Sequence, residues 1–255
     1  MKTIRRKRWA VLPALAAVAV LAGAAAPQDG SRATARHPFG AGERAEYQVR
    51  LGAVSVGSGT IEVVGTETVG GQATYHARMR VSGGFGPARV NDRYESWIDT
   101  DELFSRRFRQ QVQEVRYRRD RTYDFFPERM TYRRENGDTG TLASNRPLDD
   151  LSFMYYVRTL PLEVGDEYTL NRYFKESGNP VVVKVVRKET VRVPAGTYRT
   201  IVVQPVIQTD GLFGEGGRAE IYFSDDRHRI PVLIKSRVPV VGSLTMSLRS
   251  FRPSS

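Results

Sequence analysis

The chain has 255 residues, 40% of them hydrophobic, and its 39 lysines and arginines against 28 aspartates and glutamates give a formal net charge of +11 at pH 7. Because it contains no cysteine, disulfides, thiolate metal ligands, cysteine nucleophiles and lipid attachment through an N-terminal cysteine are all excluded. Stability must therefore come from a hydrophobic core.

The first 26 residues predict a secretory signal peptide. Five basic residues precede an apolar run from Trp9 to Leu21, and small residues follow up to Ala26. This order of segments is typical of export signals, and the apolar run is shorter than the roughly 20 residues that a membrane-spanning helix needs. We therefore expect cleavage near Ala26 and a location in the periplasm or outer cell envelope.

The remainder of the chain predicts one domain preceded by a short tail. Residues 27–42 contain glycine, proline and polar residues without periodicity, so we expect this segment to be flexible after cleavage. Residues 43–255 are enough for one large all-β domain and show no internal repeat of fixed period. The predicted parts are thus the signal peptide at 1–26, the flexible segment at 27–42 and a single β-barrel-like domain at 43–255.

Alternation of apolar and polar side chains, broken by glycine and asparagine turns, dominates this domain. In "TYHARMRVS", Met79 points to one face and His76 and Arg80 to the other, so we expect His76 to be exposed to solvent. The pair Asn136-Gly137 separates two short alternating runs and predicts a hairpin with a tight primed turn. Roughly a dozen such strands predict an all-β, mainly antiparallel fold, a curved sheet or incomplete β-barrel.

One segment between the strands has helical spacing instead. In "NRPLDDLSFMYYVRTLP", Asp149 or Asp150 stands where an N-cap belongs, Leu151 and Met154 follow on one face, and a proline comes just after the end. We therefore predict one short helix, near Asp150 to Arg158. Such a helix either closes one side of a cavity or plugs the end of the barrel, and we favour the plug.

Arginine is concentrated in one region. Ten arginines lie between Arg106 and Arg134 with four acidic residues among them, and tyrosines and phenylalanines alternate with them. Arginine and aromatic side chains together suit nucleic acid, but export argues against that partner. We expect instead a lipid headgroup, a glycolipid or an acidic envelope polymer, with peripheral contact to a membrane. The arginine bias of the whole chain is an alternative origin for this run. The candidate ligand-binding residues on this basic face are Arg116, Arg118, Arg119 and Arg121.

Three polar clusters are predicted to be turns rather than sites. In "DDRHR", Asp225, Asp226 and His228 offer one imidazole and two adjacent carboxylates, which falls short of a metal site. "DTDEL" from Asp99 lacks the glycine and the terminal glutamate of a calcium loop. "DGLFGEGG" from Asp210 precedes a strand, whereas a phosphate-binding loop opens onto a helix. We predict no metal and no cofactor.

No catalytic residues are predicted. The chain has no G-x-S-x-G motif, and none of its three histidines has an evident orienting partner in the sequence. A pair of carboxylates brought together across strands, as in a glycosidase, stays open because the linear sequence does not show cross-strand contacts. We therefore favour a non-catalytic protein.

The pattern of turns and apolar positions resembles a family of exported bacterial proteins, domain of unknown function 3108. The resemblance starts with "GERAEYQVRLGAVSVGSGTIEV" at Gly42 and includes "DDLSFMYYVRTLPLEVGDEY", "VPAGTYRTIVVQP" and "IYFSDDRHRIPVLI". It implies an antiparallel, barrel-like β-protein of the periplasm or outer envelope, and no established activity.

Three functions are compatible with these features. The leading hypothesis is an exported protein whose concave face binds an apolar or anionic amphiphilic molecule, such as a lipid or glycolipid. The alternatives are a scaffolding or assembly factor that binds protein or polymer, and a hydrolase of envelope glycans. A carrier needs an empty apolar cavity, a scaffold needs a filled core, and a hydrolase needs two carboxylates that converge in a cleft.

Overall fold

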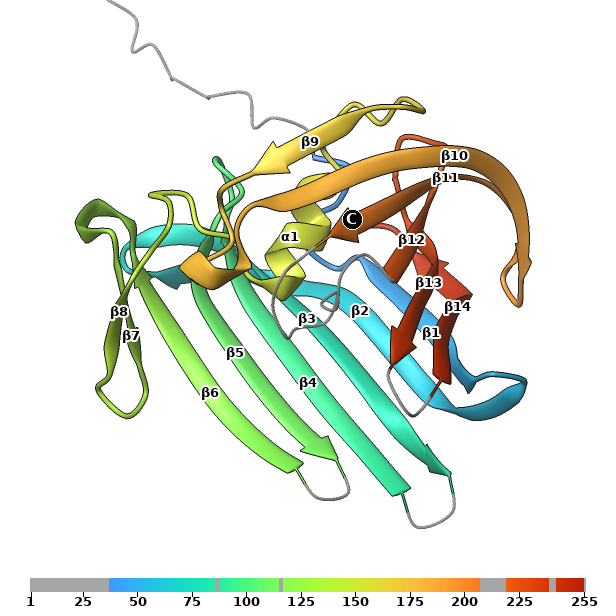
Figure 1. Cartoon of the computed structure of the whole chain (residues 1–255), viewed down its shortest axis with the longest axis horizontal. Coiled ribbons are helices and arrows are strands. Elements are labelled where there is room, and N and C mark those ends of the chain that lie inside the picture. Colours follow the sequence, from blue (N-terminus) through green and yellow to red (C-terminus); the bar gives the residue numbers. More distant parts are fainter. Residues whose placement is uncertain (1–36, 86–87, 115–116, 207–218, 239–241, 255) are drawn as a thin grey trace, which may run out of the picture. The chain divides into compact units, whose positions relative to one another are not determined.

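The computed structural model describes residues 37–254 except for 86–87, 115–116, 207–218 and 239–241 (Figure 1). The expected signal peptide, most of the expected flexible segment and the loop "DGLFGEGG" lie outside the described residues.

Within the described residues, fourteen strands form one antiparallel sheet, which confirms the predicted all-β fold. The strands are β1 (Arg44–Leu51), β2 (Val54–Val69), β3 (Gln72–Phe85), β4 (Ala88–Asp99), β5 (Ser105–Glu114), β6 (Tyr117–Phe126), β7 (Thr131–Arg134), β8 (Thr139–Thr141), β9 (Glu167–Leu170), β10 (Val181–Val193), β11 (Gly196–Val206), β12 (Ala219–Ser224), β13 (Pro231–Val238) and β14 (Gly242–Arg252). The described helices are α1 (Asp150–Val157) and the short 3-10 helices η1 (Pro127–Arg129) and η2 (Glu176–Gly178).

The sheet is not closed into a barrel. Its hydrogen-bonded order is β8-β7-β6-β5-β4-β3-β2-β1-β14-β13-β12-β11-β10-β9, so β8 and β9 form its two edges. In Figure 1, strands β1 to β6 form one wall, strands β9 to β14 form the other, and α1 lies between them. An incomplete barrel with one short helix is the architecture predicted from the sequence.

Part of β6 is also an edge of the sheet. Strand β7 pairs only with Tyr123–Phe126, so among the described strands the stretch from Arg118 to Arg121 has a neighbour on the β5 side alone. At Thr122 the main chain bonds to Glu135 instead, because Thr122 N donates to the Glu135 carboxylate and Thr122 O accepts from Glu135 N. The middle of the arginine-rich region therefore lies on an unpaired strand edge.

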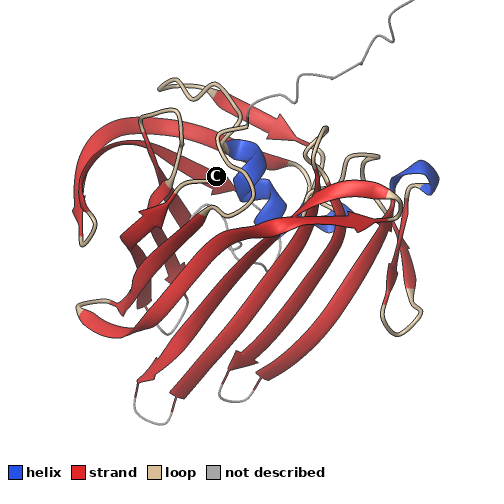
Figure 2. Ribbon diagram, turned by 180° about the vertical axis from the view of Figure 1, so that it is seen from behind, coloured by secondary structure: helices blue, strands red, loops and turns tan. Residues whose placement is uncertain are grey.

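Alternation gives β3 to β6 an apolar inner face and a polar outer face. Met79, Phe108 and Tyr123 are buried on the inner face. Phe174 packs among them, with ring centroids 6.0 Å from Phe108 and 5.0 Å from Tyr123. Figures 1 and 2 show α1 at one end of these long strands, which extend well past it. The inner face beside the helix is thus filled by side chains.

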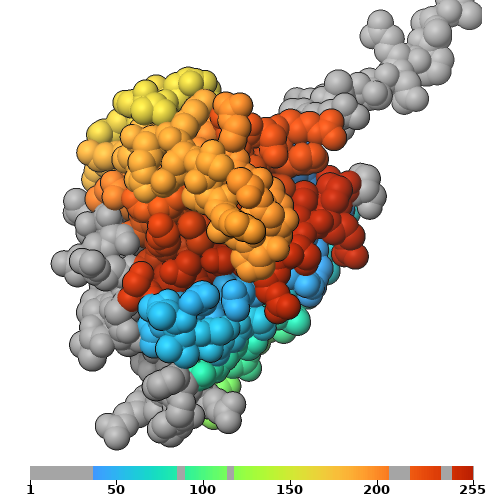
Figure 3. Space-filling view, turned by 90° about the vertical axis from the view of Figure 1, so that its right-hand side faces the viewer, coloured from blue at the N-terminus to red at the C-terminus, as the bar shows by residue number. Residues whose placement is uncertain are grey.

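The middle of β11 and most of β12 are buried on both faces. Ile201, Val202 and Val203 are consecutive and almost fully buried, which explains why this part of the sequence is a continuous apolar run. The β10–β11 hairpin reaches the end of β14, where Ala195 N donates to Leu248 O at 2.9 Å. Figure 3 shows this hairpin in orange beside the C-terminal strands in red.

Helix α1 begins where the sequence predicts, with Asp149 as its N-cap. The Asp149 carboxylate accepts hydrogen bonds from the N–H groups of Leu151 and Ser152, and the Ser152 hydroxyl accepts one from Asp149 N. The second carboxylate oxygen accepts from the hydroxyls of Ser96 on β4 and Ser105 on β5. These bonds compensate for the complete burial of Asp149 and attach the start of α1 to the first wall.

Asp150 is the first helical residue and is 3% exposed. The Tyr173 hydroxyl donates to Asp150 Oδ1 at 3.1 Å. Burial, together with the neighbouring charge of Asp149, raises the pKa of Asp150 to about 7, although the charges of Lys175 and Arg119 act in the opposite direction.

Arg158 attaches the other end of α1. Its guanidinium group is buried and donates to both carboxylate oxygens of Glu43, at 2.6 and 2.9 Å. It also donates to Pro38 O at 3.1 Å and to His228 O at 2.8 Å. One buried charge thereby connects the helix to the start of β1, to the N-terminal segment and to the β12–β13 loop.

The structure corrects the predicted extent of the flexible segment. Phe39 is buried with its ring centroid 4.8 Å from that of Tyr155, and His37 Nε2 lies 3.1 Å from Thr100 O. Residues 37–42 are therefore packed against the domain, because an aromatic side chain at position 39 fills the end of the core. Residues 27–36 lie outside the described part.

The hairpin predicted at Asn136-Gly137 joins β7 to β8, but the prediction of its turn type is wrong. Gly137 N donates to Arg134 O, and Arg134 N donates to Asp138 O. Gly137 has a φ of 90°, whereas Asn136 does not have a positive φ. A type I′ turn needs positive φ at both central residues, so the loop is a three-residue turn with glycine in the left-handed position.

Replacing Arg158 with alanine is expected to lower the free energy of unfolding by about 3–5 kcal/mol, because the Glu43 carboxylate would stay buried without its partner. Urea unfolding measures this change. The control is Arg199→Ala, whose side chain is 82% exposed and lies 3.6 Å from Asp225, and which should change stability by less than about 1 kcal/mol. Equal losses in the two variants would contradict this role of Arg158.

Replacing Asp150 with asparagine is expected to remove a pH dependence. A carboxyl group with a raised folded-state pKa takes up a proton on folding, so its contribution to stability falls as the pH rises from 3.8, its ordinary pKa, to about 7. Asp150→Asn keeps an acceptor for Tyr173. Its free energy of unfolding, relative to that of the parent, should therefore be higher at high pH than at low pH. Urea unfolding at about pH 4 and about pH 8 tests this, and an unchanged difference between the two proteins would refute it.

Candidate functional site

The outer face of β3 to β6 carries a polar groove. The strand register places Arg80, Arg93, Gln111 and Asp120 in one row across the four strands, and Gln113 lies opposite Arg118 next to that row.

The groove has a volume of about 550 Å³. Its lining consists of four arginines, three amide side chains, one carboxylate and one apolar residue. These are Arg80, Arg93, Arg118, Arg119, Asn91, Gln111, Gln113, Asp120 and Val112.

The groove has an excess of positive charge. Arg80 and Arg118 are exposed and form no hydrogen bond or ion pair within the described part of the chain. The carboxylate of Asp120 is already engaged, because it accepts from Gln111 Nε2 at 2.8 Å and from Arg109 at 3.3 and 3.4 Å. Two guanidinium groups are therefore available to an anionic ligand.

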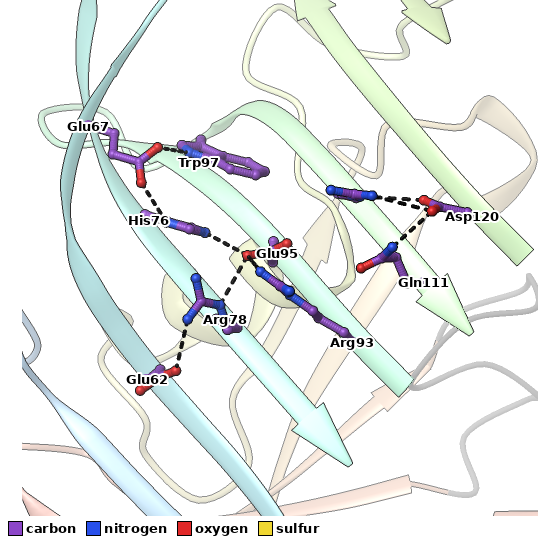
Figure 4. Close-up of polar contacts among 10 residues, drawn as sticks. Glu62, Glu67, His76, Arg78, Arg93, Glu95, Trp97, Gln111 and Asp120 are labelled. Atoms are coloured by element: carbon purple, nitrogen blue, oxygen red, sulfur yellow. Dashed lines mark hydrogen bonds and ion pairs between the residues drawn. The ribbon is translucent and has the colours of Figure 1, made fainter. Parts of the chain in front are cut away.

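Arg93 is held in the groove by Glu95. Glu95 Oε1 accepts from Arg93 at 2.6 Å, from Arg78 Nε at 3.0 Å and from His76 Nε2 at 3.0 Å (Figure 4). Glu95 is only 2% exposed, although it lies on the outer face, because these long side chains cover it. Burial alone would raise the pKa of Glu95. The three hydrogen bonds have the larger effect and hold this pKa well below its usual range.

The structure corrects the expectation that His76 is exposed. His76 lies on the outer face, as the alternation predicts, but it is only 5% exposed. Its ring stacks on Trp97 with centroids 4.5 Å apart, and His76 Nδ1 lies 2.7 Å from Glu67 Oε1. Trp97 Nε1 donates to the other oxygen of Glu67 at 2.7 Å (Figure 4). Side chains of both neighbouring strands, β2 and β4, therefore cover the imidazole, and periodicity within one strand does not reveal this.

The four arginines proposed from the sequence are not on one face. Arg118 lies on the outer face in the groove. Arg119 and Arg121 pair with Val112 and Gln110, and alternation assigns them to the inner face, although Arg119 also contributes to the groove lining. Arg116 lies outside the described residues.

Two of the three clusters predicted to be turns are turns, and the third, "DGLFGEGG", lies outside the described residues. Asp226 Oδ1 accepts from His228 N and Arg229 N within the β12–β13 loop, at 2.8 and 3.2 Å. Asp99 Oδ1 accepts from Asp101 N and Glu102 N between β4 and β5, each at 3.0 Å. Among the described residues, no group of histidine and carboxylate side chains has the geometry of a metal site, and no helix is long and apolar enough to cross a membrane.

Arg80 and Arg93 were missed because they precede the arginine-rich region. The signal was present in "HARMR" and "RYE", where each arginine has the outer-face parity of its strand. Strand register was needed to bring them beside Gln111 and Arg118.

The fold defines an open, β-barrel-like protein. A solved structure with this fold is a "Beta-barrel-like Protein of Domain of Unknown Function DUF1849" from Brucella abortus, with 12% sequence identity and a TM-score of 0.52. The match covers 84% of this chain and 98% of that chain. At this identity the likeness shows the fold alone. No curated protein matches the chain.

The family model "Protein of unknown function (DUF3108)" matches residues 46–249, which is most of the domain. The chain belongs to this family, and the resemblance seen in the sequence is confirmed.

Replacing Glu95 with glutamine is expected to lower the free energy of unfolding at pH 7 by about 1–3 kcal/mol, because Arg78, Arg93 and His76 lose a charged acceptor. A lowered carboxylate pKa contributes stability that is present above the unfolded value of 4.5 and lost as the pH falls towards the folded value. Glu95→Gln should therefore lose less stability than the parent between about pH 6 and about pH 3 in urea unfolding.

The control for this prediction is Asp120→Asn on the same face. The side chain of Asp120 is 58% exposed, so we expect a loss below about 1 kcal/mol. If Glu95→Gln lost no more free energy of unfolding than this control, and if its stability fell with acid as much as that of the parent, Glu95 would not have the central role assigned to it.

Proposed function

We propose that this protein is an exported, non-catalytic binding protein of the cell envelope, and that the groove on the outer face of β3 to β6 holds the anionic part of its ligand. The ligand is a lipid, glycolipid or acidic polymer with phosphate or carboxylate groups. The observation that carries the proposal is the pair of exposed arginines, Arg80 and Arg118, which have no partner in the described structure and line a groove whose carboxylate is already engaged.

Arginine suits this role. Its planar guanidinium group donates two parallel hydrogen bonds to a carboxylate or phosphate and stays charged at every physiological pH. In Arg93 the bond to Glu95 fixes the side chain, so part of the site is arranged before a ligand arrives. Because the groove is open to water, its affinity should depend strongly on salt.

The part of the inner face beside α1 is filled, which favours an outer site over a cavity under the helix. The rings of Phe108, Tyr123 and Phe174 occupy the inner face beside α1. A glycan hydrolase has less support, because Asp120 is the one carboxylate among the residues described in the groove lining, and hydrolysis needs two that converge. Export is supported by the basic and apolar segments of residues 1–26.

The test uses the chain from Pro27 and a fluorescent oligoglutamate, whose side chains carry carboxylates and no hydroxyl groups. Reversing both free charges, in Arg80→Glu/Arg118→Glu, should weaken binding at low salt by about tenfold or more, measured by fluorescence anisotropy. The control is Arg192→Glu/Arg199→Glu, two exposed arginines of the other wall, which changes the net charge equally. If both double variants weakened binding to the same extent, the protein would bind anions through its overall charge and not through the groove.

A further inference from the structure

Three of the nine residues that line the groove carry amide side chains. Asn91, Gln111 and Gln113 lie between the two free arginines, and Val112 is the one apolar residue among the residues described in the lining. A site for acyl chains would be lined mainly by apolar and aromatic groups. This lining therefore favours a ligand that is polar along its whole length.

The amides are free to bind a ligand. The side chains of Asn91 and Gln113 are exposed and make no hydrogen bond within the described residues, and Gln111 uses Nε2 for Asp120 but keeps its carbonyl oxygen. An amide offers both donors and acceptors, which matches the hydroxyl groups of a sugar. Asp120 adds an acceptor for hydroxyl protons.

The positions of the charges favour a ligand with more than one anionic group. Arg80 is on β3 and Arg118 is on β6, three strand spacings apart, which is roughly 14 Å across the sheet. A single carboxylate or phosphate does not span this separation. A chain of charged units that crosses β4 and β5 reaches both arginines and passes over the amides.

The geometry points to an acidic oligosaccharide, a glycan with carboxylate groups on at least two of its units, as the ligand of this groove. This inference rests on the proposed function and narrows it from anions in general to one class. The arginines bind the two carboxylates, and the amides between them bind hydroxyls. The ligand lies in the open groove across the strands, so no deep pocket is required.

The experiment compares two soluble probes with equal numbers of carboxylates, a fluorescent oligogalacturonate and an oligoglutamate. The parent should bind the oligogalacturonate about tenfold more tightly, and free galacturonate should compete at least about tenfold more weakly than the unlabelled oligomer. In Asn91→Ala/Gln113→Ala, affinity for the oligogalacturonate should fall by about tenfold, and affinity for the oligoglutamate, which has no hydroxyl groups, should fall by much less. Both alanine substitutions are at exposed positions, and circular dichroism checks the fold.

The outcomes separate the two proposals. If the oligoglutamate binds through Arg80 and Arg118 but the oligogalacturonate binds no more tightly, the glycan inference is overturned and the anion site stands. If neither probe binds and phosphatidylglycerol vesicles do not bind either, both proposals fail. If phosphatidylglycerol vesicles bind more tightly than either probe and the amide substitutions have no effect, the ligand is a lipid surface and the glycan inference is again overturned.

Discussion

A charged group in the interior holds the open sheet in shape. A closed barrel joins its walls by strand pairing on both sides, but here the two walls pair only through β1 and β14, and β8 and β9 are edges, so a further contact between the walls strengthens their connection. Arg158 makes that contact by bonding to Glu43, beside the first wall, and to His228 O in a loop of the second. At the other end of α1, Asp149 bonds to Ser96 and Ser105. Hydrogen bonds have preferred directions, so these polar contacts fix the orientation of the helix more narrowly than apolar packing alone.

The architecture was predictable from the sequence because its signals are local. Two-residue alternation marks each strand, and Asp149 followed by Ser152 marks the helix start. The groove was not predictable, because it depends on how four strands align. Successive residues of a strand point to opposite faces, and a shift of one residue in register exchanges those faces. Arg118 and Arg119 therefore form one basic cluster in the sequence but lie on the outer and inner faces of the sheet.

Charge on the outer face is balanced unevenly along the strands. Near His76, the carboxylate of Glu95 accepts three hydrogen bonds from basic side chains and is buried by them. Farther along the same strands, Asp120 is the described carboxylate in the groove, and arginines outnumber it. The face therefore has a compact, compensated region beside a region with surplus positive charge. The first gives rigidity to Arg93, and the second provides the attraction for a ligand.

The unpaired edge of β6 also determines how two copies of the chain can meet. An exposed strand edge has unpaired N–H and C=O groups that can bond to the same edge of another molecule. An open barrel has such edges, whereas a closed barrel has none. Along β6, a second copy would bring Arg118, Arg119 and Arg121 close to their own counterparts, and repulsion between like charges opposes that pairing. The outermost strands β8 and β9 are short, with three and four residues, and give little length to pair. Charge repulsion at β6 and the short length of β8 and β9 thus oppose edge-to-edge pairing of two copies.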